Sequence, residues 1–141
     1  MLNQVTVMGR LATEPVVEQI SSGIPLCKFR VACERDFPDK EGNRQTDFLS
    51  CVAWRGTANF LARNFAKGSM VIVQGQLREE VWKDAEGKGR SRMVIEADNI
   101  YFGETKQARM DRENRRGSGD AYGYTDADIP PEFAGDGQLP F

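Results

Sequence analysis

The sequence contains no histidine among its 141 residues. Histidine is the commonest general base of enzymes and the commonest protein ligand of transition metals, so its absence removes many catalytic and metal-binding designs. Cysteine is scarce as well: Cys27, Cys33 and Cys51 form no CxxC pair, and each lies in an apolar run, which indicates buried free thiols. We therefore expect no enzymatic activity, no cofactor and no bound metal.

Long apolar runs are also missing. No stretch approaches the roughly 18 apolar residues that a membrane span requires, and Met1 leads directly into a strand-like pattern without a charged and then apolar leader. These features favour a cytoplasmic protein that has no membrane partner.

Basic residues are absent from the last part of the chain. Residues 117–141 include five acidic side chains and no Lys or Arg, so the net charge of −2 for the whole chain becomes +3 for the remainder. From about residue 104 onward the chain is also poor in apolar residues, and it buries too little surface to order itself. The sequence thus predicts a mildly basic folded domain over 1–103, a flexible polar and Gly-containing linker over 104–135, and an acidic tip over 136–141.

What is present in the first 103 residues is mostly β-strand pattern. Alternating or continuous apolar residues predict five strands near residues 4–11, 24–36, 46–55, 70–82 and 93–102. One helix is predicted over 57–67, with Thr57 as its N-cap and Gly68 just past its end. Three strands, one helix and two strands form the element order of the OB-fold. We therefore predict an all-β, five-stranded Greek-key barrel with one helix between strands 3 and 4 and a disordered C-terminal tail.

Aromatic side chains stand at unusual places in this pattern. Phe37 and Trp82 are flanked by charged residues at the two predicted hairpins, so we expect both rings to be exposed. Phe48 and Trp54 lie on one face of the same strand, either as core residues or as a second exposed pair. Exposed rings on a sheet suit unpaired bases, because every base offers a face for stacking and such binding ignores base identity. Cations that neutralise phosphates accompany these rings, and we expect this role for Arg35, Arg55, Lys83, Lys88, Arg90 and Arg92.

The C-terminus ends in Leu139-Pro140-Phe141 with a free carboxylate, three residues after Asp136. Termini of this kind are captured by basic, apolar-lined pockets on partner proteins. We expect Asp136, Leu139, Pro140 and Phe141 to form a partner-binding tip. The acidic tail that carries it is also suited to compete with DNA for a basic groove.

Together these segments closely resemble the bacterial single-stranded DNA-binding protein family, over essentially the whole chain. The resemblance is carried by Leu2-Asn3-Gln4-Val5, Gly9-Arg10-Leu11, Cys51-Val52-Ala53-Trp54, Val73-Gln74-Gly75-Gln76-Leu77 and the terminal triplet. It implies sequence-independent binding of single-stranded DNA, with bases stacked on Phe37, Phe48, Trp54 and Trp82. It also implies a nucleoid-associated homotetramer whose tips recruit replication, recombination and repair proteins. One departure is that Gly137 and Gln138 separate Asp136 from the triplet, whereas acids directly precede it in the family.

Two other functions remain open at this stage. One is an OB-fold module that holds protein partners or RNA, in the manner of a primosome accessory protein, with DNA contact secondary. The other is a metal-dependent nuclease, for which Asp47, Glu96 and Asp98 would have to converge around magnesium.

Overall fold

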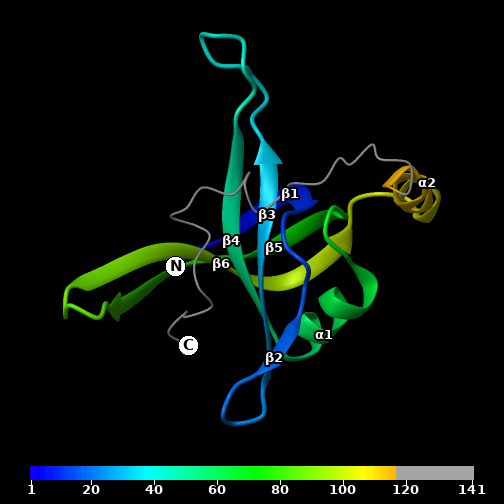
Figure 1. Cartoon of the computed structure of the whole chain (residues 1–141). Coiled ribbons are helices and arrows are strands. Elements are labelled where there is room, and N and C mark those ends of the chain that lie inside the picture. Colours follow the sequence, from blue (N-terminus) through cyan, green and yellow to red (C-terminus); the bar gives the residue numbers. More distant parts are fainter. Residues whose placement is uncertain (117–141) are drawn as a thin grey trace.

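The chain folds into a curved six-stranded sheet with two helices, shown in Figure 1. The computed structural model describes residues 1–116. Its elements in chain order are β1 (Val5–Leu11), β2 (Val17–Gln19), β3 (Pro25–Glu34), β4 (Thr46–Trp54), α1 (Arg55–Asn64), β5 (Met70–Lys83), β6 (Gly89–Phe102) and α2 (Lys106–Arg116).

The sheet closes on itself as a barrel. Its strand order is β1-β5-β6-β4-β3-β2, and β1 pairs additionally with β3 through Arg10 and Leu11, which closes the ring. The β4–β6 pairing is parallel, and all the other pairings are antiparallel. This arrangement, with α1 between the third and fourth long strands, confirms the predicted OB-fold barrel.

Alternate residues of the long strands fill the barrel, as a period of two requires. The core contains Phe29 and Val31 of β3 and Val71 and Val73 of β5, all almost fully buried. Helix α1 covers this core with Leu61, which is fully buried. Other members of the same cluster are Leu11, Cys27, Cys51, Ala53, Ala58, Phe65, Ile95, Ala97 and Ile100.

Two long hairpins, β3–β4 and β5–β6, extend from the barrel in different directions (Figure 1). The same turn ends both: the sequences are Asp39-Lys40-Glu41-Gly42-Asn43 and Asp84-Ala85-Glu86-Gly87-Lys88. In each turn the Asp carboxylate accepts backbone N–H bonds from the residues two and four positions later, at 2.9–3.0 Å. The glycine takes a positive φ of 83° or 79°, which other residues adopt only with strain. Both tips are therefore held in a defined conformation.

Three local features differ from the sequence-based expectation. Helix α1 begins at Arg55 with Trp54 as its N-cap and no side-chain cap, so the prediction of Thr57 as N-cap was wrong. Strand β4 runs directly into the helix, and Arg55 makes the turn with a φ of 56°. The three-residue β2 and the helix α2, which lies in the range expected to be linker, were not anticipated.

No helix in residues 1–116 has both the length and the apolar character needed to cross a membrane.

Candidate nucleic-acid interface

Two predicted stacking residues, Phe48 and Trp54, lie on the side of the β3–β4 sheet that faces away from the barrel core. The register pairs Phe48 with Ala32 and Trp54 with Leu26, whereas the core residue Phe29 pairs with Cys51 of the opposite side. Directly paired residues share a face of the sheet. We call the side that carries Phe48 and Trp54, together with its continuation onto β5 and β6, the outer face.

Each of these rings packs against a small apolar cluster outside the core. Phe48 is half-buried against Ala12 and Ala32. Trp54 is half-buried against a separate cluster formed by Leu26, Val52, Val94 and Ile20. A ring that is packed on one side and open on the other keeps a surface for stacking at little cost in side-chain entropy. The sequence left open whether Phe48 and Trp54 are core residues or exposed. Neither alternative holds in full, because both rings are partly buried outside the main core.

The outer face continues along β6 to the third ring. Val94 belongs to the cluster under Trp54, and Arg92 and Arg90 follow on the same side of β6 at intervals of two. Arg90 pairs in register with Trp82 of β5, so Trp82 also belongs to the outer face. The Arg92 guanidinium lies 5.9 Å from the centre of the Trp82 ring and forms an ion pair with Glu80 at 3.1 Å. The ring is half-buried and braced by a cation, so the expectation that Trp82 would be exposed was wrong.

Two basic residues that were not among the phosphate contacts predicted from the sequence lie between these rings. Lys28 and Arg30 pair in register with Val52 and Ser50, on the strand pair that carries Phe48 and Trp54. Burial lowers the pKa of both side chains, and the nearby positive charge of Arg92 lowers each pKa as well. Both shifts show that Lys28, Arg30 and Arg92 stand close together in a partly desolvated patch. The sequence pattern indicates this orientation, because Lys28 and Arg30 alternate with the buried Cys27, Phe29 and Val31 and must therefore face outward.

At the tip of the β3–β4 hairpin, Phe37 is 83% exposed, as expected from its charged neighbours. Arg35 is close in sequence but points elsewhere. Its guanidinium forms a two-fold hydrogen bond with Asp47, at 2.9 Å for both contacts, and Asp47 lies on the side opposite Phe48. This bond lowers the pKa of Asp47. The structure thus separates Arg35 from the cations of the outer face.

The remaining predicted phosphate contacts surround the outer face without forming one cluster. Arg90 is exposed and paired with Asp84 at 3.1 Å, and Lys88 is exposed in the same turn. Lys83 follows Trp82 and therefore points to the other side of β5. Arg55 is exposed at the junction of β4 and α1, directly after Trp54.

Two of the three carboxylates that a metal-dependent nuclease would require are engaged in ion pairs, and the third, Asp98, is exposed. Asp47 is held by Arg35, and Glu96 forms an ion pair with Arg78 at 3.2 Å. Across residues 1–116, no three His, Cys, Asp or Glu side chains are arranged to hold a metal ion. The tip that we expected to bind partners, with Asp136 and Leu139 to Phe141, lies outside the described residues.

The chain is similar to known proteins over the whole barrel. The model of the single-strand binding protein family matches residues 2–103. A protein named single-stranded DNA-binding protein from Oceanobacillus iheyensis is 35% identical over 83% of this chain and 73% of its own length. One of the same name from Caldanaerobacter subterraneus subsp. tengcongensis is 32% identical over 96% of this chain and 92% of its own length. The chain therefore belongs to the single-strand binding protein family.

Proposed function

We propose that this protein binds and protects single-stranded DNA on its outer face, by stacking bases on aromatic rings and by neutralising phosphates. The observation that carries the proposal is the alternation on one surface of rings and cations. Lys28, Arg30 and Arg92 lie among Phe48, Trp54 and Trp82, and Phe37 stands exposed at the hairpin tip beyond them. Stacking and phosphate neutralisation are the two contributions that single-strand binding needs. The names of the relatives support the same function.

The arrangement favours binding without preference for base sequence. Phe48 and Trp54 are six residues apart on one strand, or roughly 20 Å by strand rise, so different nucleotides must occupy them. A duplex cannot present its base faces to such separated rings, whereas a flexible single strand can follow them. The phosphate role that the sequence suggested for Arg55, Lys88 and Arg90 belongs to this proposal at the edges of the face. The same role for Lys83 would be played on the other side of β5. Lys28 and Arg30 are added to it.

The C-terminal tip would serve as the docking element for other proteins. Its support is the sequence itself, in which the apolar Leu139-Pro140-Phe141 follows an acidic stretch without any basic residue. We assign to it the recruitment of replication, recombination and repair proteins. Deleting residues 117–141 should abolish such partner binding and leave the barrel intact.

The proposal includes assembly into a homotetramer. On the side of β1, β5 and β6 that faces away from the core, Met8 pairs in register with Ile72, and Ile72 pairs with Tyr101. Met8 and Tyr101 are about half exposed, so an apolar row crosses three strands at the surface. Such a row favours contact with another copy of the chain. Light scattering should give a mass near four chains.

The test of DNA binding is a fluorescence titration with oligo-dT. Binding should quench tryptophan emission, and duplex of equal length should bind far more weakly. Trp54→Ala should cost about 1–3 kcal/mol of binding free energy, and Trp54→Phe should recover most of it, because a ring of any type can stack. A Trp54→Ala variant that binds oligo-dT like the parent would show that Trp54 only packs against its apolar cluster and does not stack on bases.

A further inference from the structure

One carboxylate of the outer face, that of Glu80, is held against a cation of the same face. Glu80 of β5 and Arg92 of β6 pair in register, and Arg92 Nε donates to Glu80 Oε2 at 3.1 Å. Both side chains are shielded, since 12% of Glu80 and 24% of Arg92 are exposed. Salt screens a shielded ion pair much less than an exposed pair, so the contact persists at moderate salt concentrations.

The Arg92 guanidinium is nevertheless incompletely satisfied. Its Nη2 is buried and has no hydrogen-bond partner within residues 1–116. Arg35, by contrast, donates from two nitrogens to Asp47, at 2.9 Å for both contacts. A buried donor without a partner destabilises the position that it occupies. Arg92 therefore gains by leaving this position when another acceptor is offered.

The pair also covers part of a proposed stacking residue. The guanidinium lies over the Trp82 ring, 5.9 Å from its centre, and so occupies one of the two faces on which a base could stack. The pair stands near a second cation, because burial lowers the pKa of Lys28, and the charges of Glu18, Arg92 and Glu80 also shift this pKa. Glu80 thus holds Arg92 within the surface that we propose for DNA.

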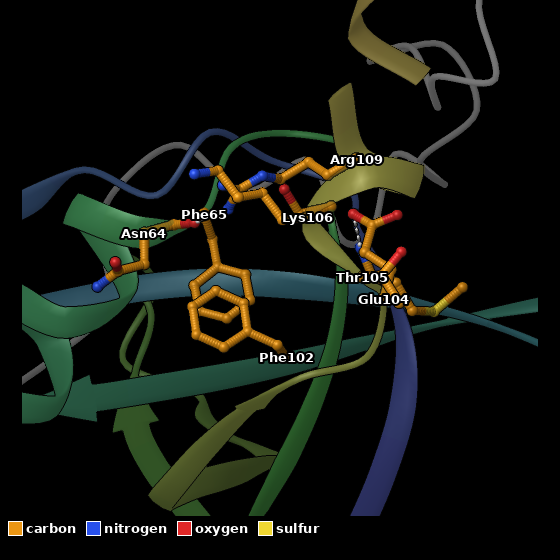
Figure 2. A pocket seen from close by; sticks show the side chains of 9 residues that line it. Asn64, Phe65, Phe102, Glu104, Thr105, Lys106 and Arg109 are labelled. Carbon is orange, nitrogen blue, oxygen red and sulfur yellow. Dashed lines mark hydrogen bonds between the residues drawn. The ribbon is translucent and has the colours of Figure 1, made fainter. Parts of the chain in front are cut away.

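A second shielded pair shows how a firmly anchored carboxylate differs. Glu104 forms an ion pair with Arg112 beside the hollow that Phe65 and Phe102 line in Figure 2. Glu104 also accepts the backbone N–H of Met70 at 3.2 Å, so the barrel itself fixes it. Within residues 1–116, Glu80 accepts a hydrogen bond from Arg92 alone. Its contact can therefore be exchanged without breaking a backbone hydrogen bond.

We propose that Glu80 restrains Arg92 in the DNA-free protein, so that a phosphate of the incoming strand must displace this carboxylate before Arg92 binds the phosphate. Carboxylate and phosphate oxygens both accept charge-assisted hydrogen bonds from a guanidinium, so one can replace the other. The exchange also uncovers the ring of Trp82. This inference deepens the proposed function and rests on it, because Glu80 then sets how tightly the outer face holds DNA.

The exchange changes the salt dependence of binding. A phosphate contact on a single strand contributes about 0.7 to the slope of log K against log salt concentration, because it releases a counterion. When Arg92 leaves Glu80, the freed carboxylate takes up a cation from solution, so this contact adds little to the slope. Without the charge of Glu80 the full contribution of Arg92 should appear.

The test compares Glu80→Gln with Glu79→Gln in anisotropy titrations of fluorescein-labelled oligo-dT at several salt concentrations. Glutamine keeps the shape of glutamate and removes its charge. Glu79 is the matched control, because it is adjacent, exposed and paired with Met93 on the other side of β5. Glu80→Gln should bind about ten-fold more tightly at low salt, with a slope larger by about 0.7 per chain. Glu79→Gln should change the affinity less than about two-fold.

The gain must depend on Arg92. In the double variant Glu80→Gln with Arg92→Met, affinity and slope should fall back to those of Arg92→Met alone, which should keep nearly the slope of the parent. Urea unfolding of each preparation establishes that the variants are folded. Four results would overturn the proposal: no gain in Glu80→Gln, an equal gain in Glu79→Gln, a gain that survives without Arg92, or a full loss of about 0.7 in slope in Arg92→Met.

A measurement without DNA separates this inference from the proposed function. Trp54→Phe leaves Trp82 as the single tryptophan, and acrylamide should quench its emission more readily after Glu80→Gln, because Arg92 no longer stays over the ring. Equal quenching would refute the restraint. If the parent failed to bind oligo-dT, the proposed function would be refuted while the quenching result stood, so the two failures are distinguishable.

Discussion

The most decisive substitution for the outer face is Arg30→Met, which keeps a long side chain and removes one charge. Arg30 lies on the strand pair that carries Phe48 and Trp54, near Arg92. Burial and this like charge both lower the pKa of Arg30, so its charged form is less favourable in the folded protein than in the unfolded chain. Methionine keeps the long apolar part of this side chain, and we expect a well-folded variant.

The magnitude for DNA binding follows from counterion release. Each phosphate neutralised on a single strand contributes about 0.7 to the slope of log K against log salt concentration. Losing the Arg30 contact should reduce this slope by about 0.7 per chain. Between about 50 and 200 mM salt, the affinity of the variant for oligo-dT should then fall about 2.6-fold less than that of the parent.

The measurement is a set of tryptophan quenching titrations with oligo-dT at several salt concentrations. Arg63→Met serves as the matched control, because it removes the same charge from the exposed side of α1. A slope that is equal for Arg30→Met and the parent, or a larger change for Arg63→Met, would refute the phosphate path across the outer face.

Four further outcomes are expected. Arg35→Met should change the salt slope less than Arg30→Met, because Asp47 already neutralises Arg35 on the opposite side of the hairpin; an equal change would place phosphates on both sides. Gly75→Ala should lower the free energy of unfolding, measured in urea, by about 1–3 kcal/mol or more, because the added Cβ would lie 1.9 Å from the Glu96 carbonyl oxygen. Gly89→Ala is the control: an added Cβ there meets open space, so the free energy of unfolding should change by less than about 0.5 kcal/mol. A thiol reagent should label Cys33 before Cys27 and Cys51, because Cys33 is half-buried and the other two are buried. Burial raises the pKa of all three thiols, to about 11 for Cys27 and further for Cys51; uniform labelling rates would contradict this order. A chain ending at Arg116 should bind oligo-dT as tightly as the parent or more tightly, and weaker binding would exclude competition between tail and DNA.

The long strands and the exposed ring of Phe37 were predictable because their causes are local. A period of two places Phe29 and Val31 inside and Lys28 and Arg30 outside, whatever the rest of the chain does. Charged neighbours around Phe37 likewise exclude a core role for this ring. The same alternation would have identified Lys28 and Arg30 as candidates had it been read for charge as well as for burial.

What could not be predicted depends on contacts between distant segments. Arg35 stands next to Phe37 in sequence, and only the pairing of β3 with β4 brings Asp47 within reach of its guanidinium. The three residues of β2 are too few to show a periodic pattern. Helix α2 is held in part by Arg109, which donates to the carbonyl oxygen of Asn64, 45 positions earlier in the chain.

The pairing of β1 with β5 also determines when the barrel can close during synthesis. Val5 pairs with Gly75, a residue that the ribosome adds 70 positions later. At about 5–20 residues per second, the first strand waits roughly 4–14 s for this partner. In that interval only the short pairing of Arg10 and Leu11 with β3 is available to it. The nascent chain therefore carries an unpaired, alternating apolar strand edge for seconds, which is the period in which we expect it to be most prone to aggregation or chaperone binding.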